Sequence, residues 1–329
     1  MPATAEPQVM QCMEVWGGNQ AVDSNVVMAG LDAWVYCKPY RDAEGGGDVY
    51  YVSSCATGRI NRLLVADVSG HGADVAQTAV QLRSLMRRHV NQIDQTRFIG
   101  TMNEQFASLA QCGCFATAIA TTFFAPTNHL SLCNAGHPPP LVYRAVERAW
   151  SFLQQDRAAK ESLPGNFPLG VVDLSSYAQF DVRLRVGDLV LCYTDSLIEC
   201  ADGQGKGELL GRPGLLDVVR TLNASDPGTF IPSLLRAIEA KACAALTGDD
   251  VTVLLFRPNG LAPTKPLGER LIAPFRVVRD IVQAWRRGDV MPWPEFSVAN
   301  LGGAMFTPLS RLFRPRKRPL ATNHTITHE

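Results

Sequence analysis

The sequence has no long apolar run and no excess of charge of either sign. No segment approaches the roughly 18 consecutive apolar residues that a membrane-spanning helix requires. The N-terminus has no basic segment followed by a long apolar one, so a secretory signal is not expected. The 31 Lys and Arg residues balance the 31 Asp and Glu residues, which argues against bulk attraction to nucleic acid. We therefore expect a cytoplasmic protein without a nucleic-acid partner.

The chain also lacks the cysteine patterns of disulfide-rich and zinc-binding proteins. Its nine cysteines are an odd number, and neither a CxxC motif nor a Cys/His array accompanies the pair Cys112 and Cys114. We interpret them as reduced thiols, mostly in the core of a cytosolic protein. A dinucleotide-binding fingerprint is missing as well, because the glycines of "GGGD" (45–48) precede a predicted strand rather than a helix.

What the chain does contain is a succession of strands and separate groups of helices. Periodicity and turn signals predict strands at 31–40 and within 42–70, helices at 73–90 and 94–110, hairpins over 114–144 and 177–196, mainly helical structure over 207–246, and a strand at 249–258. Short connections between paired strands favour an α+β fold, an antiparallel β-sandwich flanked by helices, over a doubly wound parallel sheet. The predicted parts are an N-terminal segment (1–30), one domain (31–258) and a C-terminal tail (259–329).

Aspartates stand at four of the predicted strand ends, beside glycine or other small residues. Asp67 ends one strand, Asp195 follows another, Asp48 opens a third, and Asp249 and Asp250 open the last. Taken singly, each is more often an ordinary turn residue. Taken together, they are the carboxylate oxygens that Mg²⁺ and Mn²⁺ prefer, and neighbouring strand ends can bring them into one cleft.

Five motifs carry a resemblance to a known family. They are "VADVSGHG", "NAGHPPPLVYR", "FPLGV", "RVGDLVLCYTDS" and "GDDVTVLLFRP", which lie in this order between about residue 46 and residue 258. In order and approximate spacing the chain resembles the metal-dependent PPM-type serine/threonine phosphatases, in particular their bacterial SpoIIE-like branch. The resemblance implies an αββα sandwich and hydrolysis of phosphoserine or phosphothreonine by a water held between two Mn²⁺ or Mg²⁺ ions.

The resemblance also implies roles for individual residues. It assigns catalysis and metal binding to Asp67, which would bridge both ions, to Asp195 and to Asp249. The remaining metal-site positions are the Val68 backbone carbonyl, Asp48, which would mostly hold metal-bound waters, and Asp250. Two positions depart from the family pattern: no Asp follows Tyr50-Tyr51, and Ser196 replaces the glycine of the family's "TDG".

Two histidines and two arginines have open roles. His71, four residues beyond Asp67, is either a general acid for the leaving oxygen or a turn residue. For His137 we favour a loop histidine that hydrogen-bonds turn carbonyls, because prolines follow it. Arg41 and Arg59 flank the glycine turn and either pair with a phosphate or carry solvated surface charge.

The last part of the chain is basic. From residue 260 onward there are 11 Lys and Arg against 5 Asp and Glu, so the first 259 residues are net acidic. Apolar residues from Leu271 to Trp285 recur at helical spacing among arginines and predict a basic amphipathic helix, followed by a disordered tail. This part either docks on the acidic domain or contacts a partner or an anionic membrane.

Two functions follow from these observations. The first is an active phosphatase whose partner is a phosphorylated signalling protein, for which the resemblance suggests an anti-sigma-factor antagonist. The second is a catalytically weak scaffold that binds a regulatory partner through a phosphatase fold, and the missing Asp after Tyr51 is its sequence support.

Overall fold

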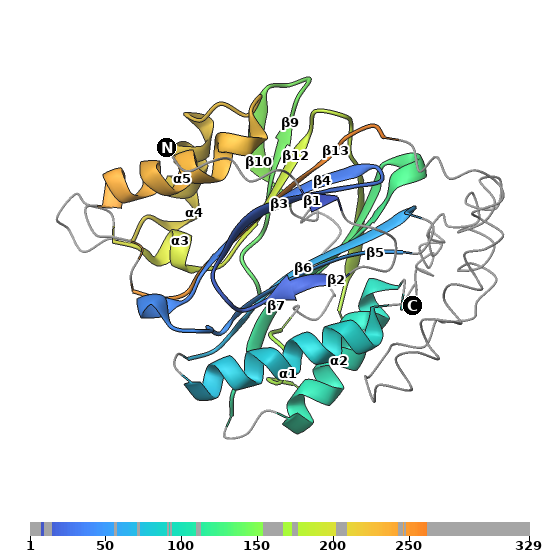
Figure 1. Cartoon of the computed structure of the whole chain (residues 1–329), viewed down its shortest axis with the longest axis vertical. Helices are drawn as coiled ribbons and strands as arrows, with labels where there is room; N and C mark the ends of the chain where they lie inside the picture. The colour runs from blue at the N-terminus through green and yellow to red at the C-terminus, as the bar shows by residue number, and fades with distance from the viewer. Residues whose placement is uncertain are drawn as a thin grey trace, which may run out of the picture. The chain divides into compact units, whose positions relative to one another are not determined.

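The computed structural model contains two β-sheets packed face to face, with helices on both outer faces (Figure 1). The structure describes residues 8–9, 15–55, 58–70, 73–90, 92, 94–109, 113–153, 167–172, 177–201, 209–242, 246 and 248–261. This architecture confirms the predicted α+β sandwich.

One sheet has six strands in the order β11-β8-β7-β6-β5-β2, all antiparallel. Their bounds are β2 (Val15–Gly18), β5 (Asp48–Ser54), β6 (Ile60–Val68), β7 (Ala116–Phe124), β8 (His129–Ala135) and β11 (Gln179–Arg183). Successive side chains of β5 point to opposite faces. Tyr50 and Val52 therefore face the other sheet, whereas Val49 and Tyr51 face the covering helices.

The other sheet has seven strands in the order β1-β3-β4-β13-β12-β9-β10. Its bounds are β1 (Gln8–Val9), β3 (Val22–Met28), β4 (Leu31–Lys38), β9 (Leu141–Arg144), β10 (Ala149–Phe152), β12 (Leu189–Tyr193) and β13 (Val251–Pro258). All pairs are antiparallel except β1 with β3. The central strand β13 is buried along most of its length, which explains why its sequence is almost continuously apolar.

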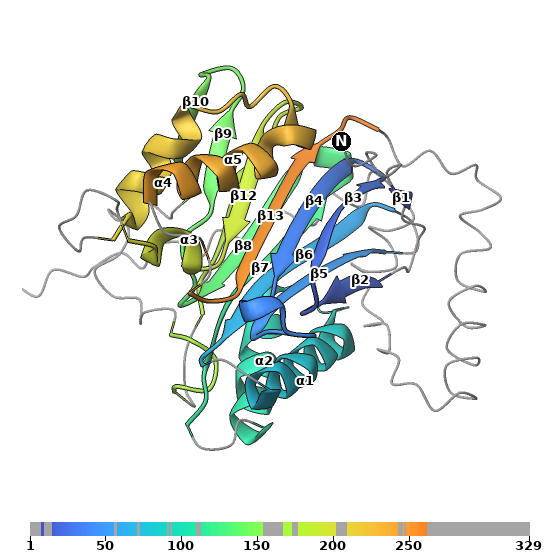
Figure 2. The same cartoon turned by 60° about the vertical axis from the view of Figure 1, so that its left-hand side comes forward.

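Two groups of helices cover the outer faces (Figure 2). Helices α1 (Ala73–His89) and α2 (Gln95–Leu109) pack on the six-stranded sheet. Helices α4 (Gly211–Arg220) and α5 (Pro227–Ala242) pack on the seven-stranded sheet, next to the short α3 (Ser196–Glu199). Two 3₁₀ turns complete the elements, η1 (Tyr40–Asp42) and η2 (Ala125–Thr127). The helices predicted at 73–90 and 94–110 are confirmed within one residue.

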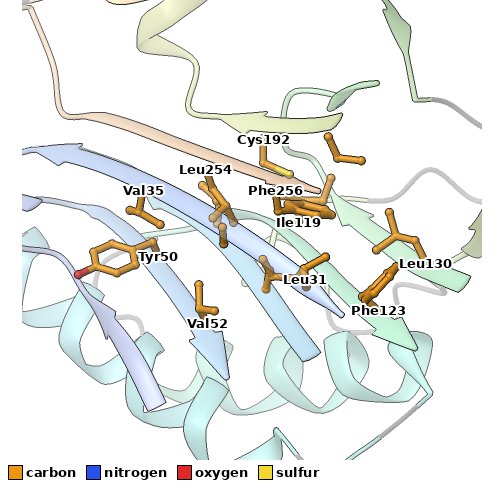
Figure 3. Packing of buried hydrophobic residues seen from close by; sticks show 14 of the residues in the cluster. Leu31, Val35, Tyr50, Val52, Ile119, Phe123, Leu130, Cys192, Leu254 and Phe256 are labelled. Carbon is orange, nitrogen blue, oxygen red and sulfur yellow. The ribbon is translucent and has the colours of Figure 1, made fainter. Parts of the chain in front are cut away.

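The core between the sheets is built from alternate residues of facing strands. Figure 3 shows Val35, Leu254 and Phe256 of one sheet opposite Val52 and Ile119 of the other. These five side chains are at most 1 % exposed. Removing so much apolar surface from water is the main force that holds the layers together.

The predicted hairpin over 177–196 is wrong. Strand β11 pairs with β8, whereas β12 pairs with β9 and β13, so the turn between them crosses from one sheet to the other. The Asp188 carboxylate holds this turn, because it accepts hydrogen bonds from the backbone N–H groups of Arg185 and Ala145 and from the Arg144 guanidinium. Val186, which lies in this turn directly before Gly187, is 60 % exposed.

Two further points concern the predicted division of the chain into an N-terminal segment, a domain and a tail. Strands β2 and β3 pair into the two sheets although they precede residue 31, so the sandwich uses part of the predicted N-terminal segment. The domain limits remain predictions, and the helix and tail predicted beyond residue 261 lie outside the described residues. Among the described helices, none combines the length and apolar character that crossing a membrane requires.

Candidate active site

The predicted site residues of both sheets lie at strand ends, as the sequence analysis expected. In the six-stranded sheet, Asp48 at the start of β5 is the register partner of Asp67 near the end of β6. In the seven-stranded sheet, Asp195 follows β12 and Asp250 precedes β13, and these two strands are paired. Antiparallel pairing thus places a start and an end side by side within each sheet.

A threonine hydroxyl ties the two sheets together at this edge. The Thr194 side chain, directly before Asp195, donates a hydrogen bond of 2.9 Å to Asp48 Oδ2. The same hydroxyl accepts a 2.9 Å bond from the backbone N–H of Thr252 on β13. Thr194 and Asp48 are both buried. The start of β5, which carries Asp48, is therefore tied to the residue directly before Asp195.

Asp250 has a different role from its neighbour. Its two carboxylate oxygens accept hydrogen bonds from the backbone N–H groups of Tyr40 and Gly47, each 2.6 Å long. Asp250 is 5 % exposed, and a Cβ atom at Gly46 would lie 2.3 Å from its Oδ1. The glycine-rich loop therefore wraps closely around this carboxylate, which leaves no room for a side chain at position 46. In this structure Asp250 anchors the loop, whereas Asp249 is exposed.

The same loop brings the Val68 carbonyl into the site. The Val68 N–H donates a 3.2 Å hydrogen bond to the Gly47 carbonyl. A Cβ atom at Gly47 would lie only 2.8 Å from the Val68 carbonyl oxygen. A glycine at position 47 is thus what allows the loop to approach this oxygen, which the resemblance identifies as a metal ligand.

Carboxylates from both sheets raise one another's pKa. Burial and then repulsion by Asp195 and Asp249 raise the pKa of Asp67 to about 7. Burial, followed by repulsion from Glu199 and Asp249, raises the pKa of Asp195 to about 6. Burial and the charge of Asp67 hold the pKa of Asp48 well above its usual range. Such coupling requires the carboxylates to share one region of low dielectric, and it disappears when a cation neutralises them.

The donors in this region fit a hard divalent cation by their chemistry. Carboxylates and a backbone carbonyl are the oxygen ligands that Mg²⁺ and Mn²⁺ take, and the mutual repulsion of the carboxylates favours a positive ion between them. Within the described ranges, no three His, Cys, Asp or Glu side chains are grouped closely enough to hold a metal ion as they stand. The predicted donors therefore lie at one edge of the sandwich, and their described side chains are not arranged as a coordination shell.

Two contributors to this site, Glu199 and Thr194, were not predicted from the sequence. Glu199 lies at the end of α3 and raises the pKa of both Asp195 and Asp67. Its spacing of four residues from Asp195 is a helical spacing that could have revealed it. For Thr194, no local signal shows that its hydroxyl reaches Asp48, because that contact joins residues 146 positions apart.

The two histidines and two arginines with open roles differ in their surroundings. His71 lies outside the described residues. His137 is 4 % exposed, and its side chain contacts the Thr117 hydroxyl rather than turn carbonyls. Arg59 is buried and its guanidinium lies over the Phe124 ring, whereas Arg41 is exposed and lies over the Tyr40 ring. Arg59 is therefore not the solvated surface charge that was the alternative to phosphate pairing.

Comparison with known proteins decides the family. The family model for Stage II sporulation protein E (SpoIIE) matches residues 58–259, more than half of the chain. The chain belongs to the SpoIIE family. The SpoIIE-type match covers β6 to β13, including Asp67, Asp195 and Asp249, and agrees with the predicted PPM-type phosphatase relationship.

Individual relatives show how far the likeness extends. The phosphoserine phosphatase RsbU of Bacillus subtilis is 21% identical over 196 residues, which are 59% of this SpoIIE-family chain and 55% of RsbU. The chain thus spans about half the length of this curated relative. The RsbU and RsbW domains of a Mycobacterium tuberculosis protein superpose with a TM-score of 0.59 at 24% identity, over 82% of this chain and 72% of that one. RsbX, solved in complex with magnesium, has a TM-score of 0.53 at 13% identity, over 72% of this chain and 100% of its own. These structures share the fold.

Proposed function

We propose that this protein is a metal-dependent phosphatase that hydrolyses phosphoserine or phosphothreonine on a signalling protein. The observation that supports this function is the meeting of Asp67 and Asp195 from opposite sheets, with Asp249 close enough to raise the pKa of both. Membership of the SpoIIE family and the phosphoserine phosphatase RsbU among its relatives give independent support.

In this proposal, Asp67, Asp195 and Asp249 bind two Mn²⁺ or Mg²⁺ ions, and the Val68 carbonyl completes the set of oxygen ligands. Such ions, when bound, supply positive charge for the phosphoryl oxygens and lower the pKa of coordinated water. Asp48 accepts the Thr194 hydrogen bond and so orients the edge of the seven-stranded sheet. Asp250 holds the glycine-rich loop against Val68.

The partner proposed is a phosphorylated protein of a bacterial signalling pathway. RsbU is named a phosphoserine phosphatase, and an RsbU domain occurs together with an RsbW domain in one structural neighbour. These names support a substrate from a partner-switching pathway, for which we propose an anti-sigma-factor antagonist. The basic residues beyond 261 are proposed to contact a partner or an anionic membrane surface, and the protein is proposed to act in the cytoplasm.

A catalytically weak scaffold is the second candidate. Its support is the absence of an acidic residue after Tyr50-Tyr51, where Val52 instead points into the core and is 0 % exposed. One measurement distinguishes the two functions, namely the metal-dependent release of phosphate from a phosphoserine peptide.

The test uses the full chain with Mn²⁺ or Mg²⁺, with and without a chelator. We expect phosphate release that a chelator abolishes and added metal restores. Asp67→Asn and Asp249→Asn are expected to lower the rate at least a hundredfold while the circular dichroism spectrum is unchanged. Activity that survives thorough chelation would refute the metal-dependent mechanism, and metal binding without turnover would favour the scaffold.

A further inference from the structure

His137 lies between the two sheets, behind the strand ends that carry Asp67 and Asp195. Its Nδ1 atom is 2.8 Å from the Thr117 hydroxyl, and Thr117 on β7 is the register partner of Asp67 on β6. On the other side the ring faces the main chain of Tyr193, the last residue of β12. One buried side chain therefore lies between the strand beside Asp67, to which it is hydrogen-bonded, and the strand that leads to Asp195.

The loop that carries His137 orients the ring independently of these contacts. The Asn134 side chain accepts a 2.8 Å hydrogen bond from the His137 N–H and donates a 2.8 Å bond to the His137 carbonyl. Gly136 has a φ of +72°, and a Cβ atom there would lie 2.6 Å from Pro168 Cγ. Such a closed loop leaves the backbone of His137 few alternative conformations.

The ring is neutral near neutral pH. Burial lowers the pKa of His137 to about 3, so the ring is not a proton donor for a leaving group near neutral pH. A neutral ring that accepts the Thr117 hydrogen bond at Nδ1 carries its own proton on Nε2. Nε2 makes no hydrogen bond within the described residues, and the main chain of Tyr193 is the group of β12 that acts on the ring.

We propose that His137 is a positioning residue that sets the spacing between the strand ends bearing Asp67 and Asp195, and thereby the affinity of the site for divalent metal. This inference rests on the proposed function. The Thr194–Asp48 bond ties the sheets at the edge itself, and His137 supplies a second contact between them through Thr117 and Tyr193. Ligand oxygens must be placed to within a few tenths of an ångström to bind metal well, so the loss of this spacer weakens binding.

The test compares Thr117→Val with Thr117→Ser in the full chain. Valine keeps the shape of threonine and removes the hydroxyl, whereas serine keeps the hydroxyl. Isothermal titration with Mn²⁺ measures metal affinity without any need for turnover, and urea unfolding in chelator measures stability. We expect Thr117→Val to weaken Mn²⁺ binding about tenfold and to lower kcat with KM changed less than twofold. Thr117→Ser is expected to stay within twofold of the unmodified chain on each measure.

A spectroscopic measurement and a second variant complete the test. Nitrogen NMR of the histidine rings is expected to show a neutral ring with the proton on Nε2 for His137 in the unmodified chain and in Thr117→Ser, and a changed Nδ1 signal in Thr117→Val. His137→Gln is expected to share the loss of metal affinity.

The outcomes separate this inference from the proposed function. A folded Thr117→Val that binds Mn²⁺ as the unmodified chain does would overturn the inference and leave the phosphatase proposal intact. If the unmodified chain binds neither Mn²⁺ nor Mg²⁺, the phosphatase proposal fails and the inference falls with it. Failure of both Thr117→Val and His137→Gln to fold would assign His137 to stability alone and overturn its positioning role.

Discussion

Two adjacent aspartates, Asp249 and Asp250, are expected to respond in opposite ways to the same substitution. Asp250 is buried and accepts two 2.6 Å hydrogen bonds from backbone N–H groups, whereas Asp249 is exposed. We expect Asp250→Asn to destabilise the metal-free fold. We expect Asp249→Asn to leave its stability unchanged or slightly higher, because repulsion of Asp67 and Asp195 is relieved, and to abolish turnover. The sequence, which contains the two residues side by side, does not separate these effects.

The expected size follows from the hydrogen bonds of Asp250. An asparagine has one acceptor oxygen, so either Tyr40 or Gly47 loses its partner and its N–H faces an amide donor. A hydrogen bond to a charged group contributes about 1.5–3 kcal/mol, and a buried N–H left unpaired costs about 1–3 kcal/mol. These two figures describe the same lost bond from its two sides, so they are not added. Relief of the repulsion between Asp250 and the carboxylates of Asp48 and Asp67 offsets part of the loss. We therefore expect a loss of about 1–3 kcal/mol in the free energy of unfolding.

Urea unfolding in the presence of a chelator measures this difference, because bound metal would add its own stabilisation. With a slope of about 2–3 kcal/mol per molar urea, the midpoint of Asp250→Asn falls by about 1 M. Asp249→Asn is the matched control, since its side chain can still accept the bond from the Asp250 N–H. Equal midpoints for the two variants would refute the loop-anchor role assigned to Asp250.

Three further outcomes are expected. Because the pKa of Asp67 is raised to about 7, the stability that its protonated form contributes is complete below about pH 4 and is lost as the pH rises through 7. Urea unfolding of the chelated protein should show this fall, of which Asp67 contributes up to about 4 kcal/mol. Asp67→Asn should reduce the fall and leave the part that belongs to Asp48 and Asp195, whose pKa values are also raised. Phe256→Ala, at a core position that is 0 % exposed, should cost about 3–5 kcal/mol in the same assay, whereas Val186→Ala at a 60 % exposed position should change stability by less than about 0.5 kcal/mol. A chain cut after Leu261 should remain folded by circular dichroism and active, but a cut after Pro258 should be less stable, because it removes the Asn259 amide that donates to the Met28 carbonyl and to Asp32; equal melting temperatures for the two truncations would contradict this.

Local patterns were sufficient for most elements between residues 31 and 258 and for the site residues that stand at strand ends. Helix α1 follows from apolar residues at steps of three and four, and its buried face includes Ala79, Leu82, Leu85 and Met86. The position of Asp67 at the end of an apolar strand, next to glycine, already indicated a carboxylate held near the backbone of a loop. These features depend on residues within a few positions of one another, so the sequence contains them directly.

Local patterns did not predict which strands pair with one another. The alternation of Phe180 and Val182 shows that one face of β11 is covered, but both sheets of a sandwich cover one face of each strand. The pattern therefore does not distinguish a hairpin within one sheet from a turn that crosses between sheets, and the hairpin prediction failed at Gly187-Asp188. The Asp188 side chain accepts hydrogen bonds from Arg144 at the end of β9 and from the following Ala145, and these bonds hold the turn that crosses between the sheets.

By itself, the sequence determined most strands and helices between residues 31 and 258, that several aspartates stand at strand ends, and that the order of motifs is that of a phosphatase family. The tertiary structure alone decided which aspartate anchors the loop, which hydroxyl reaches Asp48, and what His137 contacts. The physical reason is that side-chain hydrogen bonds between residues far apart in the chain depend on strand register and sheet packing. Asp250 meets Tyr40 across 210 positions because β13 pairs with β4, and no local pattern encodes that distance.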